Sequence, residues 1–279
     1  MAGSKKGNPS GAPPAKPDPI LQASANGVLT ITLNRPDALN SLNRGLMEQF
    51  RAVLAEAAAN TSVRALIITG AGRGFCAGAD LAEQAAAPPV SRGQGISDGM
   101  TSHFNPLARD LAAFPKPTVA AVNGVAAGGG VGLALACDIV VAARSATFIQ
   151  VFAPQLGLVP DMGCSWHLPR LVGAARARGL ALLGDRLSAE DAAAWGLIWQ
   201  SVEDAALMHR AGEIAAKLAA GPILGLVRTR EVLAAAFDND LAAQLDLERR
   251  TQFELGNSED FAEGVRAFTQ KRPPKFTGR

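Results

Sequence analysis

Near the start of the chain, apolar and polar residues follow first one period and then another. Residues 28–33 (VLTITL) alternate apolar and hydroxyl side chains with a period of two, which predicts a strand with one buried face. Apolar residues then recur at helical spacing from Leu42 to Ala57, and either Asn40 or Ser41 is placed to cap that helix. The pattern therefore predicts a strand followed by an amphipathic helix.

Farther along, short apolar runs alternate with helical segments. The runs 65–69 (ALIIT) and 118–122 (TVAAV) do not alternate, so both are predicted to be strands buried on both faces. The glycine cluster at 128–130 opens a small-residue helix that reaches Cys137, and residues 139–142 again resemble a strand. This succession of strands and helices predicts an α/β fold.

The pattern changes after about residue 204. A helix is predicted to open at Ser188, whose hydroxyl can cap it, and beyond residue 204 helical spacing continues without strand signals. Residues 82–99, rich in Ala, Pro, Gly and Ser, have no period and are predicted to form a mobile loop. We therefore expect a disordered extension over 1–19, a core over 20–203 and a helical C-terminal region over 204–279.

Composition narrows the possible classes of protein. Apolar residues make up 48% of the chain and charged residues 19%, which is typical of a folded globular protein. Lys and Arg number 27 against 25 Asp and Glu, so the overall charge does not indicate a nucleic-acid or membrane partner. The three cysteines are widely spaced and suggest neither disulfides nor metal ligands. Without a membrane-spanning run or a signal-peptide pattern, the expected protein is soluble and cytoplasmic.

Two glycine-rich segments are candidates for chemistry. Residues 70–81 (GAGRGFCAGADL) and 123–132 (NGVAAGGGVG) each follow a buried strand and precede a helix. Glycine lets the backbone approach a ligand closely, and free N–H groups at a helix start can bind an anion. Tight packing alone is the simpler interpretation of a single glycine cluster. No G-x-G-x-x-G follows the first strand, so a dinucleotide site is not indicated.

Several longer motifs occur in a fixed order: NRPDALNSLN (34–43), GRGFCAGADL (72–81), PKPTVAAVNGVAAGGG (115–130), CDIVVAARSATF (137–148) and LGLVPDMG (156–163). Together they resemble the crotonase (enoyl-CoA hydratase/isomerase) superfamily, over roughly residues 20–279. Within it the chain is most similar to the phenylacetate-pathway isomerases, which act on ring-epoxidised phenylacetyl-CoA. That similarity rests on FNPLARDLAAFPKP, LALLGDRLSAEDAAAWGLIWQ, AAQLDLERR and EGVRAFTQKRPPKFTG.

The resemblance implies a spiral of β-β-α turns, a helical C-terminal trimerisation region and assembly as a homo-trimer or hexamer. It also implies that a thioester oxygen is bound between the backbone N–H groups of Ala77 and Gly129. Gly129 sits where a helix is predicted to begin, and the helix dipole there favours negative charge. No metal or redox cofactor is implied, since coenzyme A is part of the acyl-CoA substrate.

The resemblance also implies where the proton-transferring groups lie. Hydratases of the superfamily use two glutamates, and the corresponding positions here are Gly132 and Ala153, which cannot transfer protons. The acid nearby is Asp161, where several isomerases of the family carry their catalytic carboxylate. Taken alone, an Asp after proline is more simply a helix cap. Hydration needs two proton-transferring groups, whereas a 1,3-proton shift needs one, so the missing glutamates favour isomerisation.

Coenzyme A contacts are likewise implied by the resemblance. They fall on Ala38, Leu39, Ala79, Asp80, Leu81 and Gly128, with Lys271 and Lys275 as candidates for the phosphates, from this chain or a neighbouring subunit. Asp80 is also placed to cap a helix. The three histidines, His103, His167 and His209, lack metal-ligand spacing.

Three alternatives remain open. The first is an enoyl-CoA hydratase of fatty-acid or aromatic degradation. The second is RNA binding, because one crotonase homologue binds AU-rich RNA through a lysine-rich helix. Here the equivalent helix carries Arg44, Glu48, Arg51 and Glu56, a mixed face that argues against it. The third is a catalytically silent assembly subunit.

Overall fold

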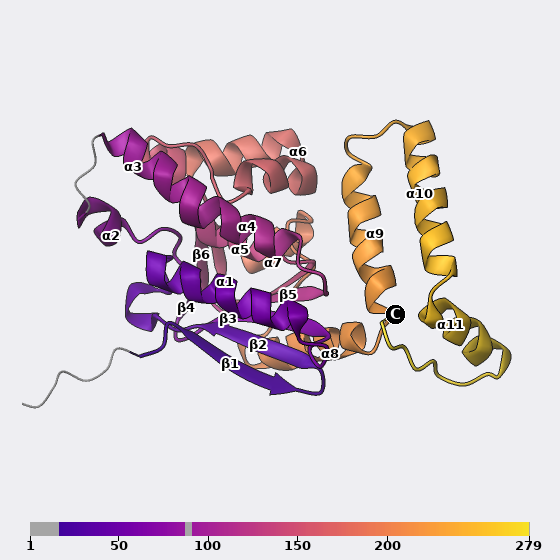
Figure 1. Ribbon diagram of the computed structural model, residues 1–279. Coiled ribbons are helices and arrows are strands. Elements are labelled where there is room, and N and C mark those ends of the chain that lie inside the picture. Colours follow the sequence, from indigo (N-terminus) through magenta and orange to yellow (C-terminus); the bar gives the residue numbers. More distant parts are fainter. Residues whose placement is uncertain (1–16, 87–90, 279) are drawn as a thin grey trace, which may run out of the picture.

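The computed structural model describes residues 17–86 and 91–278, and two β-sheets form the centre of this part of the chain (Figure 1). The larger sheet has the order β1-β2-β3-β5-β7-β10 and the smaller one β4-β6-β8-β9. All pairs are parallel except β1 with β2 and β8 with β9. The strands are Ile20–Ala25 (β1), Val28–Leu33 (β2), Ala65–Gly70 (β3), Gly74–Cys76 (β4), Thr118–Val122 (β5), Val125–Ala127 (β6), Ile139–Ala143 (β7), Thr147–Ile149 (β8), Leu187–Ser188 (β9) and Gln200–Val202 (β10).

Helices cover the sheets and make up the C-terminal part. They are Arg44–Ala59 (α1), Leu81–Ala86 (α2), Arg92–Gly99 (α3), Asn105–Ala112 (α4), Gly129–Leu135 (α5), Cys164–Leu183 (α6), Ala189–Ala194 (α7), Leu207–Ala219 (α8), Ile223–Ala235 (α9), Leu241–Gly256 (α10) and Glu259–Thr269 (α11). Short 3-10 turns span Pro36–Ala38 and Asp204–Ala206, and π-helical turns span Met100–Phe104 and Phe152–Leu156. None of the described helices is long and apolar enough to cross a membrane.

The predicted α/β fold is confirmed. The predicted strands at 28–33, 65–69, 118–122 and 139–142 are β2, β3, β5 and β7. β2 buries alternate side chains, whereas the first five residues of β3 and all of β5 are buried, as their sequence patterns indicate. Of the expected disordered extension over 1–19, residues 1–16 lie outside the described part of the chain.

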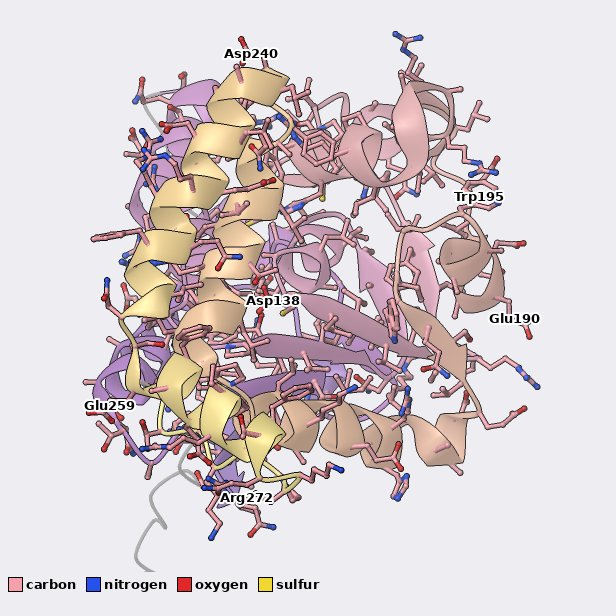
Figure 2. The ribbon with its side chains drawn as sticks, turned by 90° about the vertical axis from the view of Figure 1, so that its right-hand side faces the viewer. Asp138, Glu190, Trp195, Asp240, Glu259 and Arg272 are labelled. Atoms are coloured by element: carbon pink, nitrogen blue, oxygen red, sulfur yellow. The ribbon has the colours of Figure 1, made fainter. Side chains whose placement is uncertain are left out.

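Helices follow residue 204 as predicted, but the first long one belongs to the core. α8 packs on β3, β5 and β7 and buries Leu207, Ala211, Ala215 and Ala219. α9, α10 and α11 stand to one side of the sheets (Figure 1). In Figure 2, α9 and α10 lie side by side, with Asp240 at one end of the pair and Glu259 at the other.

One arginine joins α9 to the sheet. Arg230 contacts the carboxylate of Asp138 at 3.2 Å and donates a hydrogen bond to the carbonyl of Phe114 at 2.6 Å. Asp138 in turn accepts hydrogen bonds from the backbone N–H and the hydroxyl of Thr118, the first residue of β5. α9 is therefore anchored where β5 and β7 begin, in the interior of the larger sheet.

Two sequence predictions of local structure are wrong. The cap of α1 is Asn43, whose side chain accepts a hydrogen bond from the N–H of Leu46, and not Asn40 or Ser41. Asn40 instead is fully buried in a left-handed conformation (φ 57°). Its amide donates to the carbonyls of Ala71 and Gly74, and its oxygen accepts from the N–H of Arg35. Asn40 thus holds the turn before α1 against β4.

The second wrong prediction concerns residues 82–99, where most of the expected loop is helical. α2 covers residues 81–86 and α3 covers 92–99, while 87–90 lie outside the described residues. Ser91 caps α3 by accepting a hydrogen bond from the N–H of Gln94. α3 continues through the π-helical turn into α4, which buries Leu107 and Leu111. Packing downstream of the segment stabilises this helix, so the composition of the segment alone did not reveal it.

We expect Asn40→Ala to lower the free energy of unfolding by about 3 kcal/mol, because it leaves two part-buried groups, the N–H of Arg35 and the carbonyl of Ala71, without this partner at about 1 to 3 kcal/mol each. The Gly74 carbonyl keeps a hydrogen bond from Asn123. Asn43→Ala is the matched control and should cost only about 1 kcal/mol, the usual value of a lost helix cap. Urea denaturation of both variants measures the difference. Equal losses would contradict the role assigned to Asn40.

Candidate active site

The two glycine-rich segments meet because the strands before them are paired. β4 runs parallel to β6, so the turns that follow Cys76 and Ala127 lie next to each other. Gly78 has a φ of 86°, and a Cβ atom there would lie 2.8 Å from the Ala127 carbonyl oxygen and 3.1 Å from the Gly129 nitrogen. Only glycine permits this approach, so the backbone around residue 78 reaches the start of α5.

Two backbone N–H groups at this junction have no acceptor among the described residues. Gly129 is the first residue of α5, where N–H groups have no partner within the helix. Ala79 lies between two residues whose backbone groups are hydrogen-bonded to Leu42. The N–H of Leu42 donates to the Gly78 carbonyl at 2.7 Å, and the N–H of Asp80 donates to the Leu42 carbonyl at 3.0 Å. The N–H of Ala79 itself is left free. Two such donors can stabilise an oxygen that gains negative charge.

The prediction that Ala77 supplies one of these donors is wrong. Its N–H donates to the carbonyl of Leu39 at 3.0 Å and is therefore already engaged. The free N–H lies two residues later, at Ala79, which the resemblance had placed among the coenzyme contacts. Which amide stays free depends on the register of the Leu39–Leu42 segment against this turn, and the motif alone does not reveal that register.

Asp161 lies in the turn between Pro160 and α6, close to the first turn of α5. A Cβ atom at Gly129 would lie 3.6 Å from Oδ1 of Asp161. α6 begins at Cys164 after Gly163 and has no side-chain cap, so the interpretation of Asp161 as the cap of this helix is wrong. The structure thus brings Asp161 and Gly129 together, as the sequence predicted.

The environment of Asp161 changes its acidity. Burial raises the pKa of its carboxyl to about 6, and its own backbone N–H opposes this only partly. A carboxyl whose pKa lies near neutral pH can both accept a proton and give it back. Asp161 therefore has the acidity that a proton relay requires.

The two positions that the sequence resemblance equates with hydratase glutamates hold no acid. Gly132 lies in α5 and Ala153 in the π-helical turn 152–156, and neither side chain can titrate. Burial raises the pKa of the neighbouring Cys164 to about 12, and burial followed by the charge of Arg170 lowers that of His167 to about 4. Neither is suited to proton transfer near neutral pH. In the described part of the chain, no cluster of His, Cys, Asp and Glu could hold a metal ion.

The candidate coenzyme residues of the first half of the chain gather around the free amides. The 3-10 turn ending at Ala38 and the left-handed Leu39 (φ 48°) pack against Gly74 of β4. Leu81, which begins α2, is half exposed. Gly128 precedes Gly129 with a φ of 51°. The carbonyl of Leu39 accepts a hydrogen bond from the N–H of Ala77, so the Leu39 turn borders the segment that leads to Ala79.

Asp80 is held in place and ionised. It contacts Arg35 at 2.7 Å and accepts hydrogen bonds from the N–H groups of Ala82 and Glu83, which confirms it as the cap of α2. Partial burial raises the pKa of its carboxyl, but the hydrogen bond and charge of Arg35, together with the N–H groups of Glu83 and Ala82, outweigh this, and the pKa lies below its usual value. Asp80 therefore organises the turn and does not relay protons.

Lys271 and Lys275 are not brought to the site within one chain. The C-terminal tail is bound by Arg64, which donates to the carbonyl of Thr277 at 2.9 Å, and by Asp260, which accepts from the N–H of the same residue at 2.7 Å. Arg64 precedes β3, whereas the free amides lie beyond its other end. A strand of this length separates its ends by roughly 17 Å.

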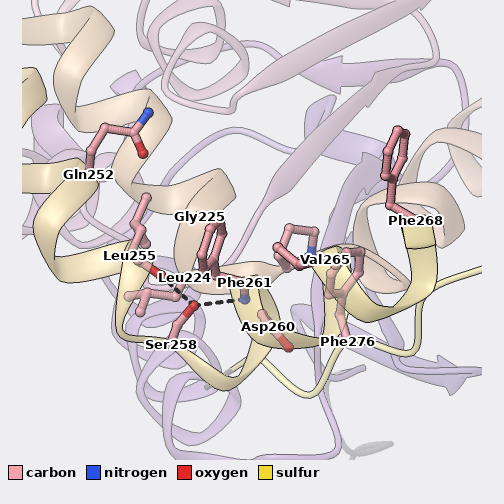
Figure 3. Close-up of a pocket in the computed structure, with 13 residues that line it drawn as sticks. Leu224, Gly225, Gln252, Leu255, Ser258, Asp260, Phe261, Val265, Phe268 and Phe276 are labelled. Carbon is pink, nitrogen blue, oxygen red and sulfur yellow. Dashed lines mark hydrogen bonds between the residues drawn. The ribbon is translucent and has the colours of Figure 1, made fainter. Parts of the chain in front are cut away.

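An apolar cavity lies away from these residues. It is a groove of about 700 Å³ between α9, α10 and α11 (Figure 3). Its lining is mostly apolar and includes Leu224, Leu255, Phe261, Val265, Phe268 and Phe276. Its carboxylate, Asp260, accepts hydrogen bonds from the N–H groups of Thr277 and Gly278 and so holds the C-terminal tail.

A family model described as enoyl-CoA hydratase/isomerase matches residues 23–279. The chain belongs to this family. The crotonase fold expected from the sequence is thereby confirmed. A solved structure of a putative enoyl-CoA hydratase/isomerase from Mycobacterium abscessus superimposes with a TM-score of 0.87 at 36% identity, over 93% of this chain and 100% of that one.

Two relatives of this crotonase differ in the reaction they are named for. The 1,2-epoxyphenylacetyl-CoA isomerase of Escherichia coli (strain K12) is 48% identical over 93% of this chain and 98% of its own. A probable enoyl-CoA hydratase of Rhodobacter capsulatus is 45% identical over 91% of this chain and 96% of its own.

The raised pKa of Asp161 makes a prediction about stability. Because the pKa is about 6 in the folded state and 3.8 as an isolated group, ionised Asp161 destabilises the fold. We expect Asp161→Asn to raise the free energy of unfolding at pH 8 by up to about 3 kcal/mol, from about 1.36 kcal/mol per pKa unit. The difference should shrink as the pH falls through 6 and vanish below about 4. Denaturation of both proteins from pH 4 to 8 measures it, and a difference independent of pH would contradict the assignment.

Proposed function

We propose that this crotonase is an acyl-CoA isomerase in which one aspartate relays a proton. The thioester oxygen of the substrate binds between the N–H groups of Ala79 and Gly129, and Asp161 moves the proton. The observation that carries the proposal is the lone carboxyl of Asp161, which has a pKa of about 6 and faces the start of α5. Gly132 and Ala153 leave it without a second acid.

The chemistry follows from these three groups. Two amide donors on the thioester oxygen stabilise an enolate, and one such donor is typically worth about 2.7 to 4 kcal/mol in the transition state. Asp161 as carboxylate removes a proton from carbon next to the thioester or in conjugation with it. As carboxylic acid it then returns the proton to another carbon on the same face. Substrate and product have the same composition, so no water is consumed.

The acyl group that we propose is ring-1,2-epoxyphenylacetyl, with oxepin-CoA as the product. The 48% identity to a protein named 1,2-epoxyphenylacetyl-CoA isomerase supports this substrate and a place in phenylacetate catabolism. In that reaction the amides and Asp161 assist opening of the epoxide and rearrangement to the seven-membered ring. Double-bond shifts in linear unsaturated acyl-CoAs need the same groups and form a second substrate class, which would connect the enzyme to fatty acid metabolism.

Hydration of enoyl-CoA is the alternative, and the 45% identical relative named as a probable hydratase favours it. Hydration needs one group to activate water and a source for the added proton. Asp161 alone supplies one of these roles.

Coenzyme A is proposed to bind along Ala38, Leu39, Asp80, Leu81 and Gly128. Backbone and apolar groups of these residues border the free amides. Lys271 and Lys275 would reach the phosphates of a coenzyme A bound to a neighbouring copy of the chain. Their position at the opposite end of β3 supports contact between copies over contact within one chain.

We also propose that the chain assembles as a homo-trimer or hexamer through its C-terminal helices. Large apolar side chains are exposed there: Leu241 and Phe253 are each 74% exposed and Phe268 is 88% exposed. Large apolar side chains exposed in this way are typical of subunit interfaces.

The reaction is tested with aromatic-epoxide, 3-enoyl and crotonyl thioesters of coenzyme A in water labelled with oxygen-18. We expect isomeric products without the label, and negligible hydration of crotonyl-CoA. Asp161→Asn should lower kcat by about 100-fold or more, in line with the loss of a general acid–base group. In the wild type, kcat should rise with pH through about 6 as Asp161 ionises. Incorporation of label, or full activity of Asp161→Asn, would contradict the proposal.

Assembly is tested by sedimentation equilibrium. The wild type should have the mass of three or six chains, and Leu241→Glu should lower it, because a buried charge in an interface is strongly unfavourable. Leu21→Glu, on the exposed face of β1, is the control and should leave the mass unchanged. A monomeric wild type would contradict this proposal without affecting the proposed reaction.

A further inference from the structure

The turn that carries Asp161 has an unusual backbone. Met162 is buried with a φ of 49°, in the left-handed region that residues other than Gly, Asn and Asp rarely adopt. It is followed by Gly163 with a φ of 80°. A bulky residue stays in this conformation only when the surrounding structure enforces it.

Helix α5 provides the surface that holds this turn. A Cβ atom at Gly132 would lie 2.3 Å from the Met162 carbonyl oxygen and 3.0 Å from its carbonyl carbon. A Cβ atom at Gly129 would lie 3.0 Å from Cγ of the same methionine. Gly129 and Gly132 are three residues apart and so share one face of the helix. Met162 therefore fits against a face that has no side chains.

The contact at Gly132 is the more restrictive of the two. The atoms that crowd it include the backbone of Met162, which cannot rotate away as a flexible side chain can. Any side chain at position 132 must therefore displace the turn. Asp161 is the neighbour of Met162 in that turn, so displacement moves its carboxyl away from Gly129.

We propose that Gly132 is a positioning residue for Asp161: its lack of a side chain lets the Met162 backbone pack against α5, and this contact holds the Asp161 carboxyl beside the free amide of Gly129. The inference rests on the proposed function of Asp161. It has a consequence for the type of reaction. A second carboxylate on α5 at position 132 is incompatible with the present position of Asp161, so the two-acid arrangement cannot be obtained by changing Gly132 alone.

Gly132→Ala tests the contact with the smallest possible side chain. We expect kcat to fall by about 100-fold, the scale expected when a reacting group moves by about 1 Å, with KM changed by less than about two-fold. Gly212→Ala is the matched control: Gly212 lies in α8 with no atom within 4 Å of its Cβ position. This control should keep the wild-type kcat and the same or a higher melting temperature.

A second readout does not need activity. Carbon-13 NMR of labelled aspartate should give a pKa near 6 for Asp161 in the wild type, and a lower value in Gly132→Ala as the displaced carboxyl meets more water. A Gly132→Ala protein with wild-type kcat and wild-type Asp161 pKa would overturn the inference.

If Gly132→Ala does not fold, the double variant Gly132→Ala/Met162→Gly takes its place. Glycine at 162 tolerates the left-handed region and frees the turn to move, so the protein should fold with low kcat and a lowered Asp161 pKa. Wild-type values in the double variant would overturn the inference. Failure of the proposed function is separate: a wild type that isomerises no thioester contradicts the reaction, while the NMR comparison still decides whether Gly132 positions Asp161.

Discussion

The parallel pairing of β4 with β6 is the contact on which the site depends. It brings the segments around these two strands so close together that they contact each other through backbone atoms and not through side chains. A Cβ atom at Gly124 would lie 2.1 Å from the Arg73 carbonyl oxygen, and one at Gly130 would lie 2.1 Å from that of Cys76. This packing fixes the two free amides relative to each other. Donors that are fixed before the reaction need no reorganisation when charge develops, which makes them effective.

The same arrangement costs stability. A buried unpaired N–H group, such as that of Gly129, costs about 1 to 3 kcal/mol, and ionised Asp161 adds to this because it is partly buried. Three of the five described non-glycine residues with positive φ, Leu39, Asn40 and Met162, also lie in the turns that form the site. The extensive apolar core around β2, β3 and β5 offsets these costs. A concentration of strained backbone conformations in the turns of one site is typical of a functional site.

The sequence predicted well what depends on side-chain pattern. The alternation in residues 28–33 and the apolar runs of β3 and β5 located the sheet, and the glycine segments located the site. What it missed depends on backbone register. Whether Ala77 or Ala79 has the free N–H is set by hydrogen bonds from a distant segment, and Asn40 was mistaken for a cap because its left-handed conformation is not visible in the sequence. α3 was missed because its stability comes from the packing of α4.

Sequence identity is a weak guide to the reaction of this chain, since relatives named as an isomerase and as a probable hydratase are 48% and 45% identical to it. Identity is averaged over the whole aligned chain, whereas the reaction depends on a few residues at the site. In the proposed mechanism, isomerisation and hydration differ in how many groups must transfer protons. That number depends on a few positions, of which Gly132 is tied to Asp161 through the backbone of Met162. The local backbone geometry therefore supports the proposed isomerisation more strongly than the small difference in identity does.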